Sequence, residues 1–421
     1  MRFAGGLLAA SWGQAVAAIV LLFSLRIYSA ELGAVPFGAA MLALGGMALF
    51  DGFTTSAFGQ VLAQLLKDLD DGRKRIGLGL GLGCDMALFQ AVTGAAAIIL
   101  TGIFLDWTSA GVLAVLLPAF CILEPVRLTG QMVLLLERRY AALSTWIALE
   151  AVMTLFFSVI AIKLTQGNPA SLVAGAVAGR IVSASIGGIA IIGSKFNVDR
   201  DAARIARPRA IRFGSSVAIM GPLGWLGLFA DRYIVGATTG LAQAGVLAAL
   251  SGAVAKPYGV ITSGLTNRFR PDMLDEAAGK ERDGFSPLTI WLLTALTIGG
   301  AGLLGFIFLS DQFADFLIAF PTPGLDMGTL LTVLAASQML VLLTHAFDNQ
   351  LLAAGQSRPL LLTQIAVLII GLPLIAIGAV WSGAIGAAIG RFGNEGLKLV
   401  AVAVLVTIVT RKSGRNSGEA A

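Results

Sequence analysis

The stretch that decides the fold runs from Leu25 to Asp68 and reads LRIYSAELGAVPFGAAMLALGGMALFDGFTTSAFGQVLAQLLKD. It ends one apolar helix at Arg26, turns through a short Gly/Pro segment, and begins a second helix with Asp51 near its middle. A related pattern returns from Asp231 to Asp272 as DRYIVGATTGLAQAGVLAALSGAVAKPYGVITSGLTNRFRPD. Charged residues inside apolar helices and a repeated design together predict a membrane protein built from two similar halves.

The composition is that of a chain embedded in lipid. Of its 421 residues, 57% are hydrophobic and 13% are charged, and the mean hydropathy is +0.86. A soluble domain carries about 25% charged residues, so most of this surface must face lipid. The sequence predicts an all-α membrane protein whose apolar runs can each cross a hydrocarbon core of roughly 30 Å. We count twelve such runs, near residues 5–28, 35–64, 76–104, 109–136, 141–164, 169–194, 210–236, 240–266, 287–310, 324–352, 358–382 and 383–410.

Three features of the runs and their connections matter for this interpretation. The last two runs are divided only by the four residues from Trp381 to Ala384. The first run lacks the short apolar region and cleavage site of a signal peptide, so we expect it to remain as a helix. The connecting segments around residues 195–212 and 267–286 are the longest hydrophilic ones, and we expect both to be loops on the same side of the membrane.

Lysine and arginine are distributed unequally between the two sides. If the N-terminus is cytoplasmic, the inside loops contain the run Lys67–Arg75, the run Lys195–Arg212, Lys280, Arg282 and the basic tail after residue 410. The alternate loops contain no Lys or Arg. This asymmetry predicts that both termini are cytoplasmic. The net charge of +5 comes mostly from these loop residues, so we expect no nucleic-acid partner.

No residue pattern indicates a cofactor or a metal. Cys84 and Cys121 lie inside expected helices and are interpreted as small buried residues, and His345 is the single histidine. The chain lacks GxxxxGK[ST], and no GxGxxG follows a strand, so ATP hydrolysis is not expected. We therefore expect no cofactor and no metal site.

The two halves of the chain are related by an ordered series of matches. A shift of 206 places Arg26 on Arg232, and a shift of 219 places Gln131 and Arg139 on Gln350 and Arg358. A shift of 207 places five small residues, Gly38, Gly45, Gly52, Thr55 and Ser56, on Gly245, Gly252, Gly259, Thr262 and Ser263. Six spans per half give both halves the same orientation, so the repeats are parallel. We expect a six-helix lobe at residues 1–200, another at 201–421 with a short cytoplasmic tail, and a cavity between them.

Several charged residues lie within the apolar runs, where an ionised side chain costs roughly 2.5–3.5 kcal/mol. Glu124 and Arg127 are three residues apart on one helix, as are Glu395 and Lys398, so each pair can neutralise itself locally. Glu150 has no such partner; an interhelical ion pair and a proton site both fit it. Asp348 lies three residues after His345, and the two could form a protonatable pair.

A second group consists of cations that have few acid partners at helical spacing, apart from Asp231 next to Arg232 and Glu395 near Arg391. A cavity with unpaired arginines suits an anion, because the guanidinium forms charge-assisted bonds to phosphate oxygens. The alternative is that these residues are helix-end anchors that reach for lipid headgroups; it is strongest for Arg26 and Arg232. The group comprises Arg26, Arg180, Arg232, Lys256 and Arg391.

Three stretches resemble the polysaccharide (oligosaccharide) flippase family of the multidrug/oligosaccharidyl-lipid/polysaccharide exporter (MOP) superfamily. They are FGAAMLALGGMALFDGF at Phe37–Phe53, AGVLAALSGAVAKPYG at Ala244–Gly259 and QLLAAGQSRPLLL at Gln350–Leu362. The resemblance implies about twelve helices in two pseudo-symmetric bundles around a central cavity with a cationic interior. It also implies a multi-pass protein of the bacterial inner membrane.

The function implied by this resemblance is lipid-linked oligosaccharide flipping. The family moves undecaprenyl-diphosphate-linked units of O-antigen, capsule or exopolysaccharide from the cytoplasmic to the periplasmic leaflet by alternating access. A polysaccharide polymerase and chain-length machinery would be its partners, besides the lipid-linked substrate and membrane lipid. Carried over, the five cations are diphosphate-contacting candidates, and Asp51, Glu150 and Asp348 are ion-coupling candidates.

Other classes fit the sequence less well. An ion-coupled multidrug or small-molecule exporter of the same superfamily would need an acidic or aromatic cavity, yet the chain has only four tyrosines. A major-facilitator transporter also has twelve spans, but the loop KDLDDGRKRIG matches its signature in charge only. A membrane-embedded glycan polymerase or ligase would present a long outside loop, which is missing, so we do not expect an enzyme.

Overall fold

The chain folds into helices that gather in two units. The computed structural model describes residues 2–67, 69–104, 107–193, 197–277 and 285–418, and within these ranges all regular structure is helical, with no strand. Contacts divide the chain into Met1–Trp225 and Leu226–Ala421. This division falls within one long helix, α8, whereas the division into lobes at residues 200 and 201 remains a prediction.

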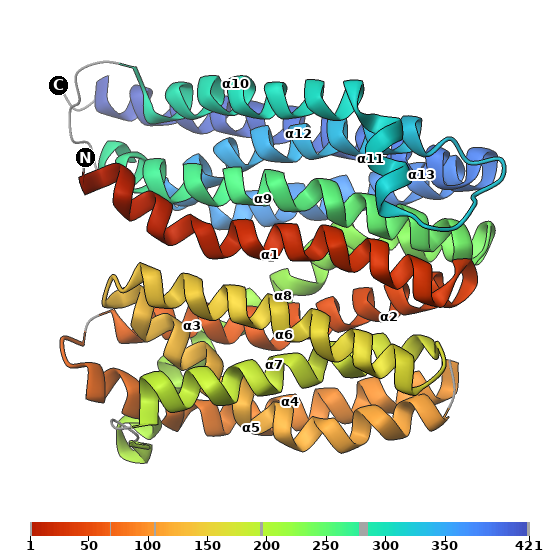
Figure 1. Ribbon diagram of the computed structural model, residues 1–421. Coiled ribbons are helices and arrows are strands. Elements are labelled where there is room, and N and C mark those ends of the chain that lie inside the picture. Colours follow the sequence, from red (N-terminus) through yellow and green to blue (C-terminus); the bar gives the residue numbers. More distant parts are fainter. Residues whose placement is uncertain (1, 68, 105–106, 194–196, 278–284, 419–421) are drawn as a thin grey trace. The chain divides into compact units, whose positions relative to one another are not determined.

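The first unit contains six segments that are long and apolar enough to cross a membrane, together with the beginning of α8. Its helices are labelled in Figure 1. Helix α2, the π-helical turn η1 and α3 follow one another without a break and form a single crossing. Helix α6 packs against α1 and α7, and α5 packs against α4 and α7. The elements are α1 (Arg2–Leu32), α2 (Ala34–Asp51), η1 (Gly52–Ser56), α3 (Ala57–Leu66), α4 (Gly72–Phe104), α5 (Trp107–Leu136), α6 (Tyr140–Leu164) and α7 (Pro169–Ile192).

The second unit is built around α12, which packs against α9, α10 and α13. Helix α13 contains two crossings, because Ser382 and Gly383 leave the helical region and Gly383 has a φ of 59°. This confirms the break expected between Trp381 and Ala384. The elements are α8 (Arg200–Thr238), α9 (Leu241–Ala277), α10 (Pro287–Phe308), α11 (Ser310–Leu317), α12 (Met327–Ala353) and α13 (Ser357–Gly418).

The helix count agrees with the sequence. Ten segments among the described residues are long and apolar enough to cross a membrane. One of them, Arg358–Val409, contains the two crossings of α13, and α8 is a further long helix. Ten segments, one extra crossing in α13 and α8 give the twelve expected helices, six in each bundle.

Two expected loops are largely helical. The segment expected as a loop at 195–212 is α-helical from Arg200, and α9 continues to Ala277 within the loop expected at 267–286. In the first case the reason is amphipathic spacing, because Ala202, Ala203, Ala206 and Ala210 form one apolar face. Lys195, Lys280 and Arg282 lie outside the described residues.

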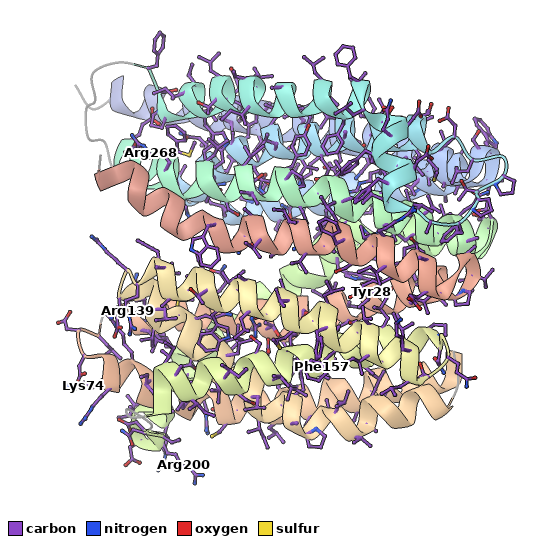
Figure 2. All side chains as sticks on the ribbon, in the orientation of Figure 1. Tyr28, Lys74, Arg139, Phe157, Arg200 and Arg268 are labelled. Atoms are coloured by element: carbon purple, nitrogen blue, oxygen red, sulfur yellow. The ribbon has the colours of Figure 1, made fainter. Side chains whose placement is uncertain are left out.

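Basic side chains gather at one end of the first unit. Lys74 lies in the first turn of α4, Arg139 precedes α6 and Arg200 begins α8. Figure 2 shows these three side chains toward the same end of the unit. The arrangement fits the lysine and arginine asymmetry that places these segments on one side of the membrane.

Glycines let α6 and α7 approach closely. A Cβ atom added to Gly179 would lie 2.5 Å from Cα and 2.6 Å from N of Thr154. These are backbone atoms that cannot rotate away, so Gly179→Ala is expected to lower the melting temperature in detergent by several degrees. Gly59→Ala is the matched control, because nothing lies within 4 Å of a Cβ there. Equal melting temperatures for the two variants would contradict this packing.

Candidate functional site

A π-helical turn places polar groups in the middle of the second crossing. Helix α2 ends at Asp51, and the residues of η1 immediately follow. The wider turn redirects side chains and is common at functional positions. Thr54 and Thr55 are buried there, and Thr54 Oγ1 donates to the carbonyl oxygen of Phe50 at 2.9 Å. Thr55 Oγ1 lies 3.4 Å from a carboxylate oxygen of Asp51 and 3.4 Å from one of Glu124.

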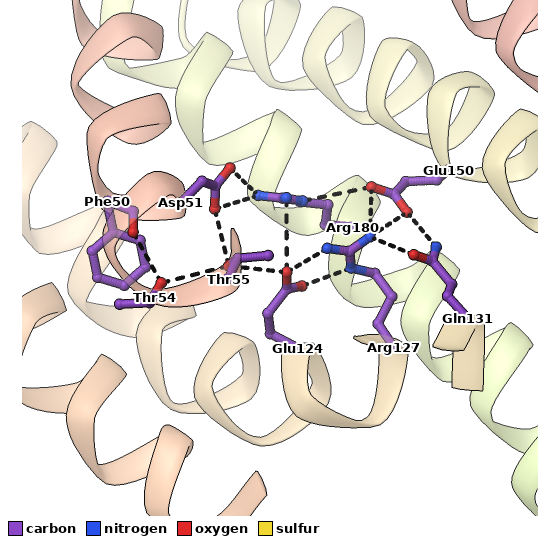
Figure 3. A network of polar contacts seen from close by, with 9 residues as sticks. All are labelled: Phe50, Asp51, Thr54, Thr55, Glu124, Arg127, Gln131, Glu150 and Arg180. Carbon is purple, nitrogen blue, oxygen red and sulfur yellow. Dashed lines mark hydrogen bonds and ion pairs between the residues drawn. The ribbon is translucent and has the colours of Figure 1, made fainter. Parts of the chain in front are cut away.

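Arg180 on α7 lies at the centre of this polar network (Figure 3). Its Nη1 donates to both carboxylate oxygens of Asp51, at 3.0 and 2.8 Å. Its Nη2 lies 3.7 Å from Oε1 of Glu124, and its Nε lies 3.6 Å from Oε1 of Glu150. Arg180 has no acid at helical spacing, so three other helices supply its partners.

Arg127 on α5 connects the remaining members of the network. Its Nε donates to Oε2 of Glu124 at 2.8 Å, which confirms the local pair expected on this helix. Its Nη1 donates to Oε2 of Glu150 at 3.1 Å and to Oε1 of Gln131 at 3.2 Å. Glu150 therefore takes part in an interhelical ion pair, and a proton site at Glu150 stays a prediction.

The charges of this network do not balance. With every group ionised, three carboxylates (Asp51, Glu124, Glu150) face two guanidinium groups (Arg127, Arg180), which leaves one negative charge in excess. Glu124 is 2% exposed. An uncompensated charge in such surroundings is costly, so the arrangement favours the uptake of one proton or one monovalent cation. The ion-coupling role of Asp51 and Glu150 stays a prediction.

The second unit contains a cavity of about 310 Å³. Its wall carries two arginines, Arg232 from α8 and Arg391 from α13, and an apolar part that includes Phe229 and Val341. The remaining polar groups of the wall come from α9 and α12, and they are Ser251, Tyr258, Thr262, Ser263, Gln338 and His345. The cavity is therefore cationic and rich in hydroxyl groups.

The two arginines of the cavity share one carboxylate. Arg391, which is 1% exposed, donates from Nη1 to Oδ2 of Asp231 at 3.1 Å and to Oγ of Ser251 at 2.8 Å. Nε of Arg232 lies 4.0 Å from Oδ1 of Asp231, and its guanidinium carbon lies 4.4 Å from the ring centroid of Phe229. Among the described residues, Nε of each arginine is buried without a hydrogen-bond acceptor. The two guanidinium groups thus outnumber the one carboxylate that forms ion pairs with them, and each keeps an N–H without an acceptor.

The other predicted site residues lie elsewhere. Arg26 on α1 and Lys256 on α9 are exposed, and Lys256 does not line the cavity. Arg180 belongs to the acidic network, so the structure brings together only Arg232 and Arg391 from the five predicted cations. Oδ2 of Asp348 lies 3.8 Å from Nζ of Lys398, and the roles assigned to all these residues stay predictions.

Sequence reasoning missed the hydroxyl groups of both sites. Thr55 contacts two carboxylates in the first unit, and Thr262 and Ser263 line the cavity of the second. One signal could have found them, because the repeat aligns Thr55 with Thr262. Tyr258, which aligns with Asp51, also lines the cavity and donates to the carbonyl oxygen of Gly299 at 3.0 Å. The aligned positions therefore carry different chemistry in the two halves. Cys84, expected to be buried, is exposed, and both cysteines are free thiols.

Comparisons with known proteins show the fold. No protein-family model and no curated protein matches the chain. Among solved structures, the lipid II flippase MurJ in an inward closed conformation has a TM-score of 0.64 at 15% identity, over 94% of this chain and 87% of that one. An inward-facing multidrug resistance MATE family transporter of the MOP superfamily has a TM-score of 0.66 at 13% identity, over 94% and 96%.

A third similar structure illustrates how the site varies on this fold. A MOP superfamily transporter from Pyrococcus furiosus has a TM-score of 0.58 at 14% identity, over 96% of both chains, and is described as having a binding pocket of reverse polarity. The chain therefore has the fold of the MOP transporters, in two six-helix bundles. At these identities the site residues, not the fold, must carry any statement about substrate.

Proposed function

We propose that this chain is a flippase for a polyprenyl-diphosphate-linked oligosaccharide in the bacterial inner membrane, with both termini in the cytoplasm. It moves the lipid-linked sugar from the cytoplasmic to the periplasmic leaflet by alternating access. The observation that carries this proposal is the cavity of the second unit, where Arg232 and Arg391 share the single carboxylate of Asp231. The similarity of the fold to MurJ, a lipid II flippase, supports the same class of substrate.

The wall of the cavity matches the chemistry of a diphosphate. Phosphate oxygens accept hydrogen bonds, and the wall offers guanidinium donors together with the hydroxyl groups of Ser251 and Ser263. Charge-assisted bonds of this kind are about twice as strong as neutral ones. The apolar part of the wall, including Phe229, lowers the local dielectric constant and strengthens them further.

The acidic network of the first unit would couple transport to an ion. Asp51 and Glu150 belong to a group with one excess negative charge, so a proton or cation can bind there and stabilise one conformation over the other. Asp348, whose Oδ1 is buried without a donor among the described residues, is a third candidate in the second unit. With the cytoplasm negative, the membrane potential also favours outward movement of an anionic substrate. Its contribution is about 2.3 kcal/mol per charge per 100 mV.

An ion-coupled exporter of small molecules is the second candidate. The specific observation in its favour is the acidic network, which could receive a cationic compound, and the similarity to a multidrug resistance MATE family transporter. The fold favours these two candidates over a major-facilitator transporter. The cationic wall around Arg391 favours the flippase over the exporter.

A transport assay separates the two candidates. Proteoliposomes would contain a fluorescent polyprenyl-diphosphate disaccharide in both leaflets, and dithionite added outside bleaches only the outer leaflet. With the active protein, we expect bleaching to continue into the inner-leaflet pool, and Arg232→Gln is expected to slow it at least about tenfold, because a charge-assisted bond contributes roughly 1.5–3 kcal/mol. Arg358→Gln is the matched control, since Arg358 is exposed and outside the cavity.

Two outcomes would contradict the flippase. One is bleaching that stops at the outer-leaflet pool although the protein is folded by its thermal unfolding transition. The other is equal transport by Arg232→Gln and by the control variant. Uptake of a lipophilic cation such as ethidium by the same proteoliposomes, without bleaching of the inner pool, would favour the exporter.

A further inference from the structure

Helix α8 is much longer than a hydrocarbon core is thick. The helix has 39 residues, which correspond to about 58 Å at 1.5 Å per residue, against roughly 30 Å for the core. Its first thirteen residues, Arg200–Arg212, contain five arginines, and we call this segment the basic arm. The arm is therefore the end that leaves the core, and the loop asymmetry assigns it to the cytoplasmic side.

The inner face of the basic arm is fixed to the first unit. Ala203 is buried in a core cluster with Phe58, Leu62 and Leu82, and Ala202, Ala206 and Ala210 pack against the same cluster. The backbone N–H of Asp199 donates to the carbonyl oxygen of Gly77 at 3.0 Å. A Cβ at Gly81 would lie 2.8 Å from that of Ala203, so α4 approaches the arm very closely. The inner face of the arm is therefore packed tightly against α4.

The outer face of the basic arm combines cations, one acid (Asp201) and exposed apolar side chains. Ile205 is 81% exposed and Ile211 is 64% exposed. Arg207 is neutralised, because its Nε and Nη2 donate to the two carboxylate oxygens of Asp85 at 2.9 and 2.8 Å. Within the described part of the chain, the other four arginines have no ion-pair partner, and all four are exposed: Arg200, Arg204, Arg209 and Arg212.

We propose that the basic arm is a binding site for acidic phospholipids of the cytoplasmic leaflet. Guanidinium groups form bidentate bonds to phosphodiester oxygens, and the negative surface of that leaflet attracts clustered arginines. Ile205 and Ile211 enter the boundary between headgroups and acyl chains, where an apolar side chain on a basic helix is stabilised. These two isoleucines identify the source of the phosphate as a lipid, because a free phosphate ion has no apolar part that could contact them.

The neighbouring segments extend the positive surface. Arg73 and Lys74 begin α4 and are exposed, and the contact between Gly77 and Asp199 places the start of α4 beside the start of the arm. Figure 2 shows Lys74 and Arg200 toward the same end of the first unit. A headgroup bound at Arg200 and Arg204 can therefore meet cations from two helices.

The test measures lipid binding in the absence of any oligosaccharide substrate, so its failure is distinct from a failure of the flippase proposal. Purified full-length protein in detergent is titrated with phosphatidylglycerol or phosphatidylcholine, and bound lipids are counted by native mass spectrometry. We expect phosphatidylglycerol to bind in preference, and Arg204→Gln/Arg209→Gln/Arg212→Gln to weaken its binding at least about tenfold. Ile205→Ser/Ile211→Ser is expected to weaken it severalfold, whereas added inorganic phosphate does not compete.

The control variant removes the same number of positive charges from the second unit. Arg268→Gln/Arg270→Gln/Arg358→Gln removes three exposed arginines of the second unit and is expected to leave phosphatidylglycerol binding by the arm within about twofold, because the contacting cations remain. Equal weakening by the two triple variants, or equal binding of phosphatidylcholine, would overturn the proposal. Competition by inorganic phosphate together with no effect of the isoleucine variant would also overturn it. Thermal unfolding of each variant checks that it is folded.

Discussion

Arg391→Gln is expected to abolish anion binding by the second unit and to destabilise that unit by about 3–5 kcal/mol. Arg391 is 1% exposed and bonds both Asp231 and Ser251. Its removal leaves the carboxylate of Asp231, which is 2% exposed, with the backbone N–H of Arg232 and the more distant guanidinium group of the same residue. Native mass spectrometry with undecaprenyl diphosphate measures the loss of anion binding, and thermal unfolding in detergent measures the loss of stability.

A double variant separates folding from binding. Arg391→Gln/Asp231→Asn removes both charges of the closest ion pair, so part of the lost stability is expected to return, because the carboxylate of Asp231 is no longer left without Arg391. Arg232 then has no carboxylate beside it, so we do not expect full recovery. Anion binding is not expected to return, because the guanidinium donors of Arg391 are still missing. A double variant that binds undecaprenyl diphosphate as tightly as the wild type would exclude Arg391 from the anion site.

Arg26→Gln is the matched control for this experiment. The repeat pairs Arg26 with Arg232, and the sequence assigned both to the substrate, yet Arg26 is exposed on α1. Its replacement is expected to change the free energy of unfolding by less than about 1 kcal/mol and to leave the cavity intact. An effect on undecaprenyl diphosphate binding as large as that of Arg391→Gln would show that the ligand is not held by the cavity of the second unit.

The helices and their number could be predicted because hydrophobicity and length are local properties. The break at Ser382 and Gly383 followed from four residues of low hydropathy between two long apolar runs. The pair of Glu124 and Arg127 followed from their spacing on one helix. In each of these cases the residues that interact are close in sequence.

The partners of Arg180 could not be predicted in this way. They come from α2, α5 and α6, and helical periodicity relates only residues of the same helix. Nor does the repeat give the environment of a residue, since Arg26 is exposed whereas Arg232 lines a cavity. The π-helical turn after Asp51 could not be predicted from the sequence either, because it leaves the hydrophobic pattern of the crossing unchanged.

Asp51→Asn and Arg180→Gln are expected to have opposite effects on the first unit. Asp51→Asn removes the one excess negative charge and keeps an oxygen that can accept from Nη1 of Arg180, so the free energy of unfolding should stay within about 1 kcal/mol of wild type or rise. Arg180→Gln leaves three carboxylates with Arg127 alone, and we expect it to destabilise the unit by about 3–5 kcal/mol.

The two variants also test ion coupling. If the network takes up a proton or cation because of its excess charge, Asp51→Asn folds normally but transports at a rate that no longer responds to an imposed pH or sodium gradient across proteoliposomes. Asp85→Asn is the control, because its carboxylate belongs to a half-exposed pair with Arg207 outside the network. A gradient response retained by Asp51→Asn would remove Asp51 from coupling. A carboxylate that accepts a proton during transport must be tolerated in its neutral form. If Asp51→Asn lost as much stability as Arg180→Gln, Asp51 would therefore be ionised at all times and would serve only as a structural counterion.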